Sequence, residues 1–244
     1  MKDSTCFKTR RCSFRAGVEV STVLAKLAVF SSGLGRLNPG IAQVMKRALD
    51  LTAGLFLLIA LLPVMVLLCG WIKLNSPGPA IIWQERLGRR GLKFNCYKFR
   101  TMFKEADSLL EEYLFNNKEA KKQWDRYQKL KGFDPRLTGP GRFLRRFSLD
   151  ELPQLVNVIN GEMSLVGPRP YLPAELKQLG AHQEKIQTCR PGLTGLWQVS
   201  GRNNITFTGR LALDRWYAEN LSLGLDLRIL AKTIVAVIGG DGAY

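Results

Sequence analysis

The most prominent feature of the hydrophobic pattern is an uncharged run, LTAGLFLLIALLPVMVLLCGWI, over residues 51–72. As one helix rising 1.5 Å per residue, this run would be about 33 Å long, enough to cross a hydrocarbon core of about 30 Å. It starts too far from Met1 for an ordinary signal peptide, and no small-residue cleavage site follows it closely. We therefore predict a membrane helix over residues 46–73 rather than a buried helix of a soluble protein.

Two features of this segment bear on its path through the membrane. Pro63 lies near its middle and removes a helix hydrogen bond, which predicts a kink. Basic residues flank both ends, whereas a single crossing usually concentrates Lys and Arg on the cytoplasmic side. The flanking residues are Lys46, Arg47, Lys73, Arg86, Arg89 and Arg90. The pattern favours a re-entrant helical hairpin broken at Pro63, with a kinked spanning helix as the alternative, because proline is tolerated in membrane helices.

The rest of the pattern predicts a basic N-terminal extension over residues 1–45 and a cytoplasmic domain over 74–244. In that domain, AIIW and KFNCYKF read as two short strands around a basic glycine turn. Mixed charge with apolar residues at helical intervals predicts a helical insertion at about 104–131. Two amphipathic helices, LALDRWYAEN and LGLDLRILAKTIVAVI, close the chain. The fold class expected is a helix-rich mixed α/β domain rather than a doubly wound sheet.

Composition narrows the chemistry. The 244 residues include 36 Lys and Arg against 20 Asp and Glu, and the net charge of +16 predicts attraction to nucleic acid, an anionic membrane surface or phosphorylated substrates. Five cysteines without a C-x-x-C pair indicate neither a disulfide framework nor a zinc site. The single histidine, His182, lies in a polar stretch, which argues against Ser-His-Asp and Cys-His catalysis.

Two adjacent carboxylates, Asp150 and Glu151, stand out in the stretch RRFSLDELPQLVNVINGEMSLVGPRP. The S-x-x-E spacing from Ser148 fits a helix capping box that requires no catalysis. A helix starting at Asp150 instead places Pro153 in the first turn, where its missing N–H costs nothing. That later start would put Asp150 at a helix N-terminus, a position that favours a bound anion such as phosphate.

Arginines around the acidic pair suggest phosphoryl transfer, because their forked donors match phosphate oxygens. An aspartate can attack phosphorus, and a neighbouring glutamate can hold Mg²⁺. Lys98 and Arg100 alternate with apolar residues on the second predicted strand and would project from one face, bound to substrate or simply solvated. On spacing alone helix capping explains the carboxylates better, and the membrane run shifts the balance to catalysis.

The chain from about Lys46 to Tyr244 resembles the bacterial sugar transferases, the monotopic polyprenyl-phosphate phosphoglycosyl transferases. Enzymes of this family begin the assembly of exopolysaccharide and of O-antigen, which is a component of lipopolysaccharide. The resemblance is nearly full length, and its motifs occur in family order. They are KRALDLTAGLFLLIALLP, NSPGPAIIWQERLGRRGLKFNCYKFRTM, DPRLTGPGRFLRRFSLDELPQLVNVINGEMSLVGPRP, PGLTGLWQVSGRN and DGAY. The insertion and the terminal motif look like the branch that transfers hexose 1-phosphate, galactose or glucose.

The resemblance implies an enzyme of the bacterial inner membrane, facing the cytoplasm, that takes a UDP-sugar and undecaprenyl phosphate and releases UMP. In the family's ping-pong mechanism, the nucleophile falls on Asp150 and the Mg²⁺ ligand on Glu151. Arg145 matches the contact to polyprenyl phosphate. Pro168, Arg169 and Pro170 match an element likened to a nucleotide contact.

The same resemblance covers the membrane helix. The family bends this helix at a Ser-Pro pair, whereas Leu62 precedes Pro63 here, so a serine hydroxyl is missing from the bend. Lys46, Arg47 and Asp50 match the family's entry to the helix and are expected to anchor it at phosphate headgroups, which electrostatics supports independently. Larger relatives carry further N-terminal membrane helices, so the chain resembles a minimal catalytic unit.

Two other function classes compete with the enzyme. A non-catalytic membrane-anchored scaffold of a polysaccharide assembly complex would use the carboxylates only as a helix cap. A nucleic-acid binder has the net charge as its sole support, and the long apolar run argues against it. We therefore expect membrane lipids and the two substrates as partners and no nucleic acid, with a homo-oligomer and the identity of the sugar left open.

Overall fold

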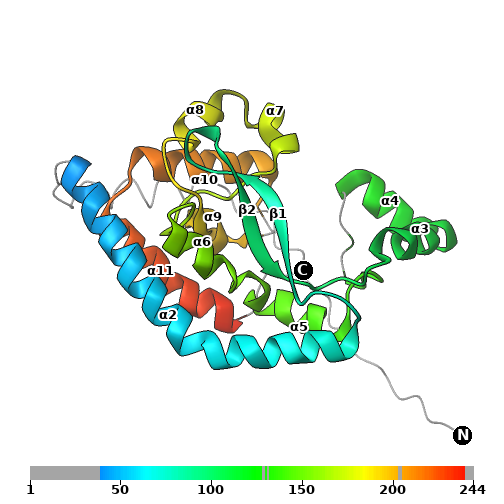
Figure 1. Cartoon of the computed structure of the whole chain (residues 1–244). Helices are drawn as coiled ribbons and strands as arrows, with labels where there is room; N and C mark the ends of the chain where they lie inside the picture. Colours follow the sequence, from blue (N-terminus) through cyan, green and yellow to red (C-terminus); the bar gives the residue numbers. More distant parts are fainter. Residues whose placement is uncertain (1–38, 128–129, 131, 203–204, 240–244) are drawn as a thin grey trace, which may run out of the picture.

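The computed structural model describes residues 39–127, 130, 132–202 and 205–239. Most of the predicted N-terminal extension and the terminal DGAY motif therefore lie outside the described residues. The long helix α2 (Pro39–Asn75) begins earlier than predicted and takes in residues 39–45, which the sequence assigned to the extension. Figure 1 shows α2, in blue to cyan, as one continuous helix that changes direction part-way along its length.

The bend of α2 agrees with the expectation from Pro63, which lies inside the helix and cannot donate to the preceding turn. The two arms do not fold back against each other, so the structure shows a bent helix rather than the expected hairpin. Residues Gly40–Asn75 are long and apolar enough to cross a membrane, and 17% of the most apolar window is buried in the protein. Large apolar side chains such as Phe56, Ile59 and Leu67 remain exposed, which suggests association with a membrane.

The two strands form an antiparallel hairpin of β1 (Ile81–Leu87) and β2 (Lys93–Phe99), in which Gln84 lies opposite Cys96. Strand β2 has the predicted bounds, whereas β1 continues four residues beyond the predicted AIIW, into the stretch assigned to the turn. The short helix η1 (Arg89–Gly91) makes the turn, with Arg90 and Gly91 at positive φ. The predicted helical insertion consists of two helices, α3 (Ala106–Asn116) and α4 (Lys118–Tyr127). They project from the body in Figure 1 and share a small apolar cluster that includes Leu110.

The body of the domain is built from short elements that follow the insertion, and its second sheet pairs β3 with β4 in parallel. The elements are α5 (Gly139–Arg146), η2 (Leu149–Glu151), α6 (Gln154–Asn160), β3 (Ser164–Val166), η3 (Pro173–Glu175), α7 (Leu176–Leu179), η4 (Gly180–His182), α8 (Gln183–Ile186), β4 (Gly192–Thr194), α9 (Leu196–Ser200), α10 (Phe207–Glu219) and α11 (Leu223–Gly239). The domain is helix-rich and mixed, as predicted.

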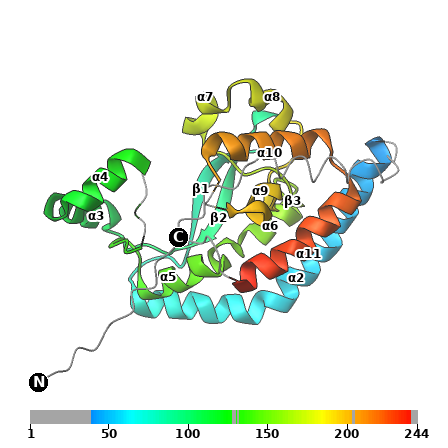
Figure 2. The ribbon, with the colours of Figure 1, turned by 180° about the vertical axis from the view of Figure 1, so that it is seen from behind.

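The main core lies where α6, the β3–β4 pair, α10 and α11 meet. Leu155, Val158, Leu213 and Ile229 are among its fully buried members. Figures 1 and 2 both place α11 beside the first arm of α2. Helix α11 completes the core through one face and exposes a second apolar face that includes Val235.

Polar contacts at the start of α2 join the helix to this core. Lys46 lies 2.6 Å from Asp226 and donates to the Val166 carbonyl, and Arg47 donates to the carbonyls of Val158 and Ile159 at the end of α6. Asp50 accepts hydrogen bonds from Ser164 and from the Leu165 amide. These three residues therefore hold α2 against the domain, which corrects the expectation that they lie at lipid headgroups.

Candidate active site

Helix α5 precedes the acidic pair in the chain, and its first turn packs closely against the backbone just after β2. Thr138 caps α5 by accepting a hydrogen bond from the Gly141 amide, and a Cβ added at Gly141 would lie only 1.9 Å from the Thr101 carbonyl oxygen. Only glycine permits that approach. Arg145, in the last turn of α5, then donates to the Thr101 hydroxyl at 3.1 Å.

Between α5 and the acidic pair the chain reverses at Ser148, whose φ of 56° is left-handed. Such a conformation is strained for a residue with a side chain, and strain of this kind gathers at functional sites. Ser148 makes no side-chain capping bond, so the capping box is not formed. Asp150 and Glu151 lie in the turn η2, ahead of α6, which begins at Gln154. The predicted helix start at Asp150 is therefore wrong as well.

Glu151 pairs with Lys98 across the site. The Lys98 ammonium lies 2.9 Å from the Glu151 carboxylate, and the side chains are 25% and 34% exposed. Lys98 belongs to β2, and the acidic pair belongs to η2, which follows the C-terminal end of α5. The structure thus brings together Lys98, Arg145, Asp150 and Glu151, four of the predicted site residues.

The electrostatics of this group depend on its burial. Burial raises the pKa of Asp150 to about 6, with the charge of Glu151 acting in the same direction and those of Lys98 and Arg145 opposing it. Burial lowers the pKa of Lys98, but Glu151 and Asp150 outweigh it, and the net pKa is raised. Burial also lowers the pKa of Arg145, against the attraction of Asp150. Asp150 is thus a carboxylate that ionises close to neutral pH among fixed cations.

Arg100 does not join this group. Its guanidinium is buried and donates to the carbonyls of Ser76 and Pro77, at 2.6 and 2.8 Å, where α2 leads into β1. Arg100 therefore satisfies backbone oxygens of the connection, and the expectation that it binds substrate beside Lys98 finds no support in its contacts.

The Pro168-Arg169-Pro170 loop is held by buried acidic and aromatic residues. Asp214 accepts hydrogen bonds from the Arg169 amide at 3.0 Å and from the Tyr171 hydroxyl at 2.7 Å. Burial raises the pKa of Asp214 to about 7, although these hydrogen bonds act against it. The Arg169 guanidinium lies 3.7 Å from Glu175 and 6.0 Å from the Trp197 ring.

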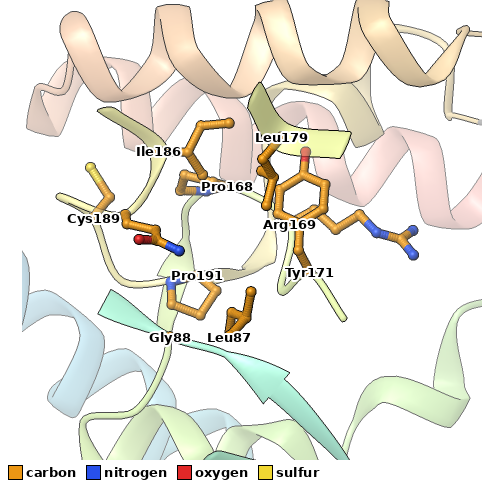
Figure 3. A pocket seen from close by; sticks show the side chains of 10 residues that line it. Leu87, Gly88, Pro168, Arg169, Tyr171, Leu179, Ile186, Cys189 and Pro191 are labelled. Carbon is orange, nitrogen blue, oxygen red and sulfur yellow. The ribbon is translucent and has the colours of Figure 1, made fainter. Parts of the chain in front are cut away.

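A cavity of about 10 Å³ lies beside this loop and is lined mainly by apolar residues, including Leu179 and Ile186. That volume is about the least that holds one water molecule. Figure 3 shows the Arg169 guanidinium pointing away from the other labelled side chains. The cavity is thus a packing gap under the loop, too small for a nucleotide.

Two residues of the site were missed in the sequence. Asp214 supports the Pro-Arg-Pro loop from α10, and Arg86 donates to the Pro170 carbonyl from β1 at 3.1 Å. Arg86 lies two positions from Gln84 on a strand, so alternation could have placed the two on one face. Nothing in the local pattern around Asp214 relates it to a loop 45 positions earlier in the chain.

The described side chains could supply only some of the ligands of a magnesium ion. Among the described residues no group of three or more His, Cys, Asp or Glu side chains could hold a metal. Mg²⁺ commonly binds one or two carboxylates and completes its shell with water and substrate phosphates. The adjacent carboxylates of Asp150 and Glu151 fit such a site.

The fold and the site together define a membrane-associated protein with a paired carboxylate among fixed cations, a suitable setting for a phosphorylated ligand. Residues 41–240 match the family described as Bacterial sugar transferase, and the chain belongs to that family.

Three relatives illustrate the match. An uncharacterized sugar transferase of Haemophilus influenzae is 46% identical over 89% of this chain and 45% of its own length. The undecaprenyl-phosphate galactose phosphotransferase of Salmonella typhimurium is 45% identical over 83% of this chain and 42% of its own length. The exopolysaccharide production protein ExoY of Sinorhizobium fredii is 44% identical over 86% of this chain and 92% of its own length. The chain thus spans less than half the length of the first two.

Proposed function

We propose that the protein is a phosphoglycosyl transferase that moves hexose 1-phosphate, galactose or glucose, from a UDP-sugar to undecaprenyl phosphate and releases UMP. The relatives named for undecaprenyl-phosphate sugar transfer and exopolysaccharide production support this reaction class. The observation that carries the proposal is the position of Asp150, a carboxylate with a raised pKa between Lys98 and Arg145. The reaction would be the first membrane step of exopolysaccharide or O-antigen synthesis.

In the first half-reaction, the Asp150 carboxylate attacks the β-phosphorus of the UDP-sugar. A bond forms between a carboxylate oxygen and phosphorus, and the bond from that phosphorus to the bridging oxygen breaks. The electron pair leaves with UMP, and Asp150 carries the sugar phosphate as an acyl phosphate. The cations Lys98 and Arg145 offset the negative charge of the diphosphate during the approach.

In the second half-reaction, a phosphate oxygen of undecaprenyl phosphate attacks the same phosphorus. The bond to Asp150 breaks, the carboxylate is restored, and sugar diphospho-undecaprenol remains in the membrane. Arg145 is the proposed contact for the incoming phosphate because its charge acts on Asp150 and because α5, which carries it, packs against the second arm of α2. Arg169 is the proposed contact on the nucleotide side.

Glu151, with Asp150 beside it, would hold Mg²⁺, which neutralises phosphate charge when bound. In the resting protein the Lys98 ammonium lies 2.9 Å from the Glu151 carboxylate. Lys98 is therefore proposed to orient the Glu151 carboxylate for binding the metal ion and the substrate.

We further propose that α2 enters the bacterial inner membrane and returns to the cytoplasmic face, with the bend at Pro63 at its deepest part. The supporting observations are the bent helix, its exposed apolar residues and the catalytic domain that packs along both arms. In this arrangement the acidic pair stands close to the surface where the lipid phosphate lies.

The test is UMP release by the purified full chain in detergent, from a panel of UDP-sugars, with Mg²⁺ and undecaprenyl phosphate. Asp150→Asn is expected to lower turnover by about 10⁴-fold or more, because no carboxylate remains to attack phosphorus. Asp107→Asn, which changes an acid in the first turn of α3, is the matched control and should retain activity.

UMP release that depends on one sugar, on Mg²⁺ and on Asp150 would support the proposal and identify the donor. No release with any donor, from protein shown to be folded, would favour the scaffold instead. Substantial UMP release by Asp150→Asn would contradict the covalent mechanism while leaving the reaction class in place.

A further inference from the structure

One face of the β-hairpin carries polar groups from the acidic pair to the Pro-Arg-Pro loop. Directly opposed residues of an antiparallel pair project to the same side, and side chains alternate along each strand. Lys98, Gln84 and Arg86 therefore share one face, with Gln84 opposite Cys96 and Arg86 opposite Phe94. Lys98, near the open end, meets Glu151, and Arg86, near the turn, meets Pro170.

Arg86 joins two elements at its end of this face. Its guanidinium donates to the Pro170 carbonyl oxygen at 3.1 Å and to the Gln84 side-chain oxygen at 2.6 Å. The residue is only 8% exposed, and its buried Nε has no hydrogen-bond partner among the described residues. Arg86 thus connects the loop that carries Arg169 to β1, the strand paired with the one that carries Lys98.

The charge of Arg86 lacks a counter-ion in contact. No ion pair between described residues includes it, and the charges of Glu175 and Glu151 act on it without a salt bridge. Burial lowers the pKa of Arg86, and the nearby charge of Arg169 lowers it further. Two neighbouring guanidinium groups without a full complement of anions favour a ligand that brings negative charge.

We propose that Arg86 is a positioning residue that fixes the Pro-Arg-Pro loop to the β-hairpin, so that Arg169 and Lys98 act together on the diphosphate of the donor. This inference rests on the proposed function and deepens it. Arg86 acts through Arg169, since its own donors are turned to Pro170 and Gln84. The diphosphate supplies the negative charge that the hairpin face and the loop lack.

An arginine is required for this task because its planar fork reaches two acceptors at once. A lysine at the same position would keep the charge but would lose the fixed fork between strand and loop. Arg86→Lys therefore separates the charge of the residue from its geometry. Gln84→Ala removes one acceptor from an exposed position and leaves the arginine in place.

The experiment measures KM for the UDP-sugar and kcat for UMP release in Arg86→Lys, Gln84→Ala and the control Glu85→Gln. Glu85 lies between them on the opposite face of β1, where it pairs with the exposed Lys93. We expect Arg86→Lys to raise KM about tenfold, the equivalent of one hydrogen bond to a charged group, with kcat changed by no more than about twofold. Gln84→Ala should raise KM about threefold, and Glu85→Gln should leave KM unchanged.

UDP binding, measured by calorimetry on the same proteins, separates this inference from the proposed function. Wild-type protein that binds UDP but releases no UMP would refute the proposed reaction, and the UDP affinities of the variants would still decide the role of Arg86. A loss of thermal stability and of kcat at unchanged KM and UDP affinity would show a purely structural residue and overturn the inference. If Arg86→Lys does not fold, an unchanged KM in Gln84→Ala overturns it.

Discussion

Two parts of this molecule that bury or partly bury charged side chains use them differently. Beneath the first arm of α2, which we call the junction, Lys46, Arg47 and Asp50 contact Asp226, backbone carbonyls and a backbone amide. Between the β-hairpin and η2, Lys98 and Arg145 act on Asp150, and the direct ion pair that the described residues form there is Lys98 to Glu151.

The junction is nearly complete in its hydrogen bonds. Tyr217 donates to Asp226 at 2.6 Å, and its hydroxyl also lies 3.1 Å from the Val166 carbonyl, which accepts from Lys46. Within the described part of the chain, one oxygen of Asp50 has no hydrogen-bond partner. At the site, by contrast, the Nε atoms of Arg86 and Arg169 are both buried without a partner among the described residues. The charges of the junction thus meet partners within the fold, whereas Lys98 and Arg145 act on Asp150 without an ion pair to it among the described residues, which suits an ionic ligand.

Breaking the junction should give the largest effect on stability. Lys46→Met leaves Asp226 buried without its cation, and Asp226 is 1% exposed. We expect a loss of about 3 kcal/mol in the free energy of unfolding, because an unpaired buried charge is costly. Denaturant unfolding in detergent measures it, and Lys73→Met, at the exposed far end of α2, is the control. Equal stability of the two variants would contradict a structural junction.

At the site, the ionisation of Asp150 should determine the pH dependence of the first half-reaction. The raised pKa of Asp150, about 6, means that the carboxyl is protonated below that pH and cannot attack phosphorus. We expect kcat/KM for the UDP-sugar to fall about tenfold for each pH unit below about 6 and to level off above pH 7. Single-turnover UMP release without undecaprenyl phosphate avoids the titration of the lipid phosphate. A flat profile between pH 5 and 7 would rule out this role for the raised pKa.

Removal of one site cation should give the smallest of these effects. Lys98 lowers the pKa of Asp150, so Lys98→Met should move the midpoint of the same profile to higher pH, by about one unit. Lys93→Met, on the same strand but paired with exposed Glu85, should leave the midpoint in place. A downward shift in Lys98→Met would show that the ammonium does not act on Asp150.

Several features of the fold could be predicted from local pattern. The uncharged run predicted the long apolar helix α2, the short strands around a glycine turn predicted the β-hairpin, and the mixed-charge stretch predicted the helical insertion of α3 and α4. Each of these depends on residues close in the chain. The capping box failed because Ser148 adopts a left-handed turn after α5, and Glu151 turns to Lys98, which lies 53 positions earlier in the chain.

The sequence alone determined that the chain carries a long apolar helix, a large positive net charge and an acidic pair among arginines, since these are properties of composition and spacing. Only the tertiary structure decided which charges hold the protein together and which face the site. Lys46 and Arg100 looked like ligands for phosphate and turned out to satisfy Asp226 and the carbonyls of Ser76 and Pro77. Arg86 was predicted only as one of the basic residues that flank the apolar run, and it joins two parts of the site. The physical reason is that a buried charge takes its role from partners that folding brings to it from distant parts of the chain.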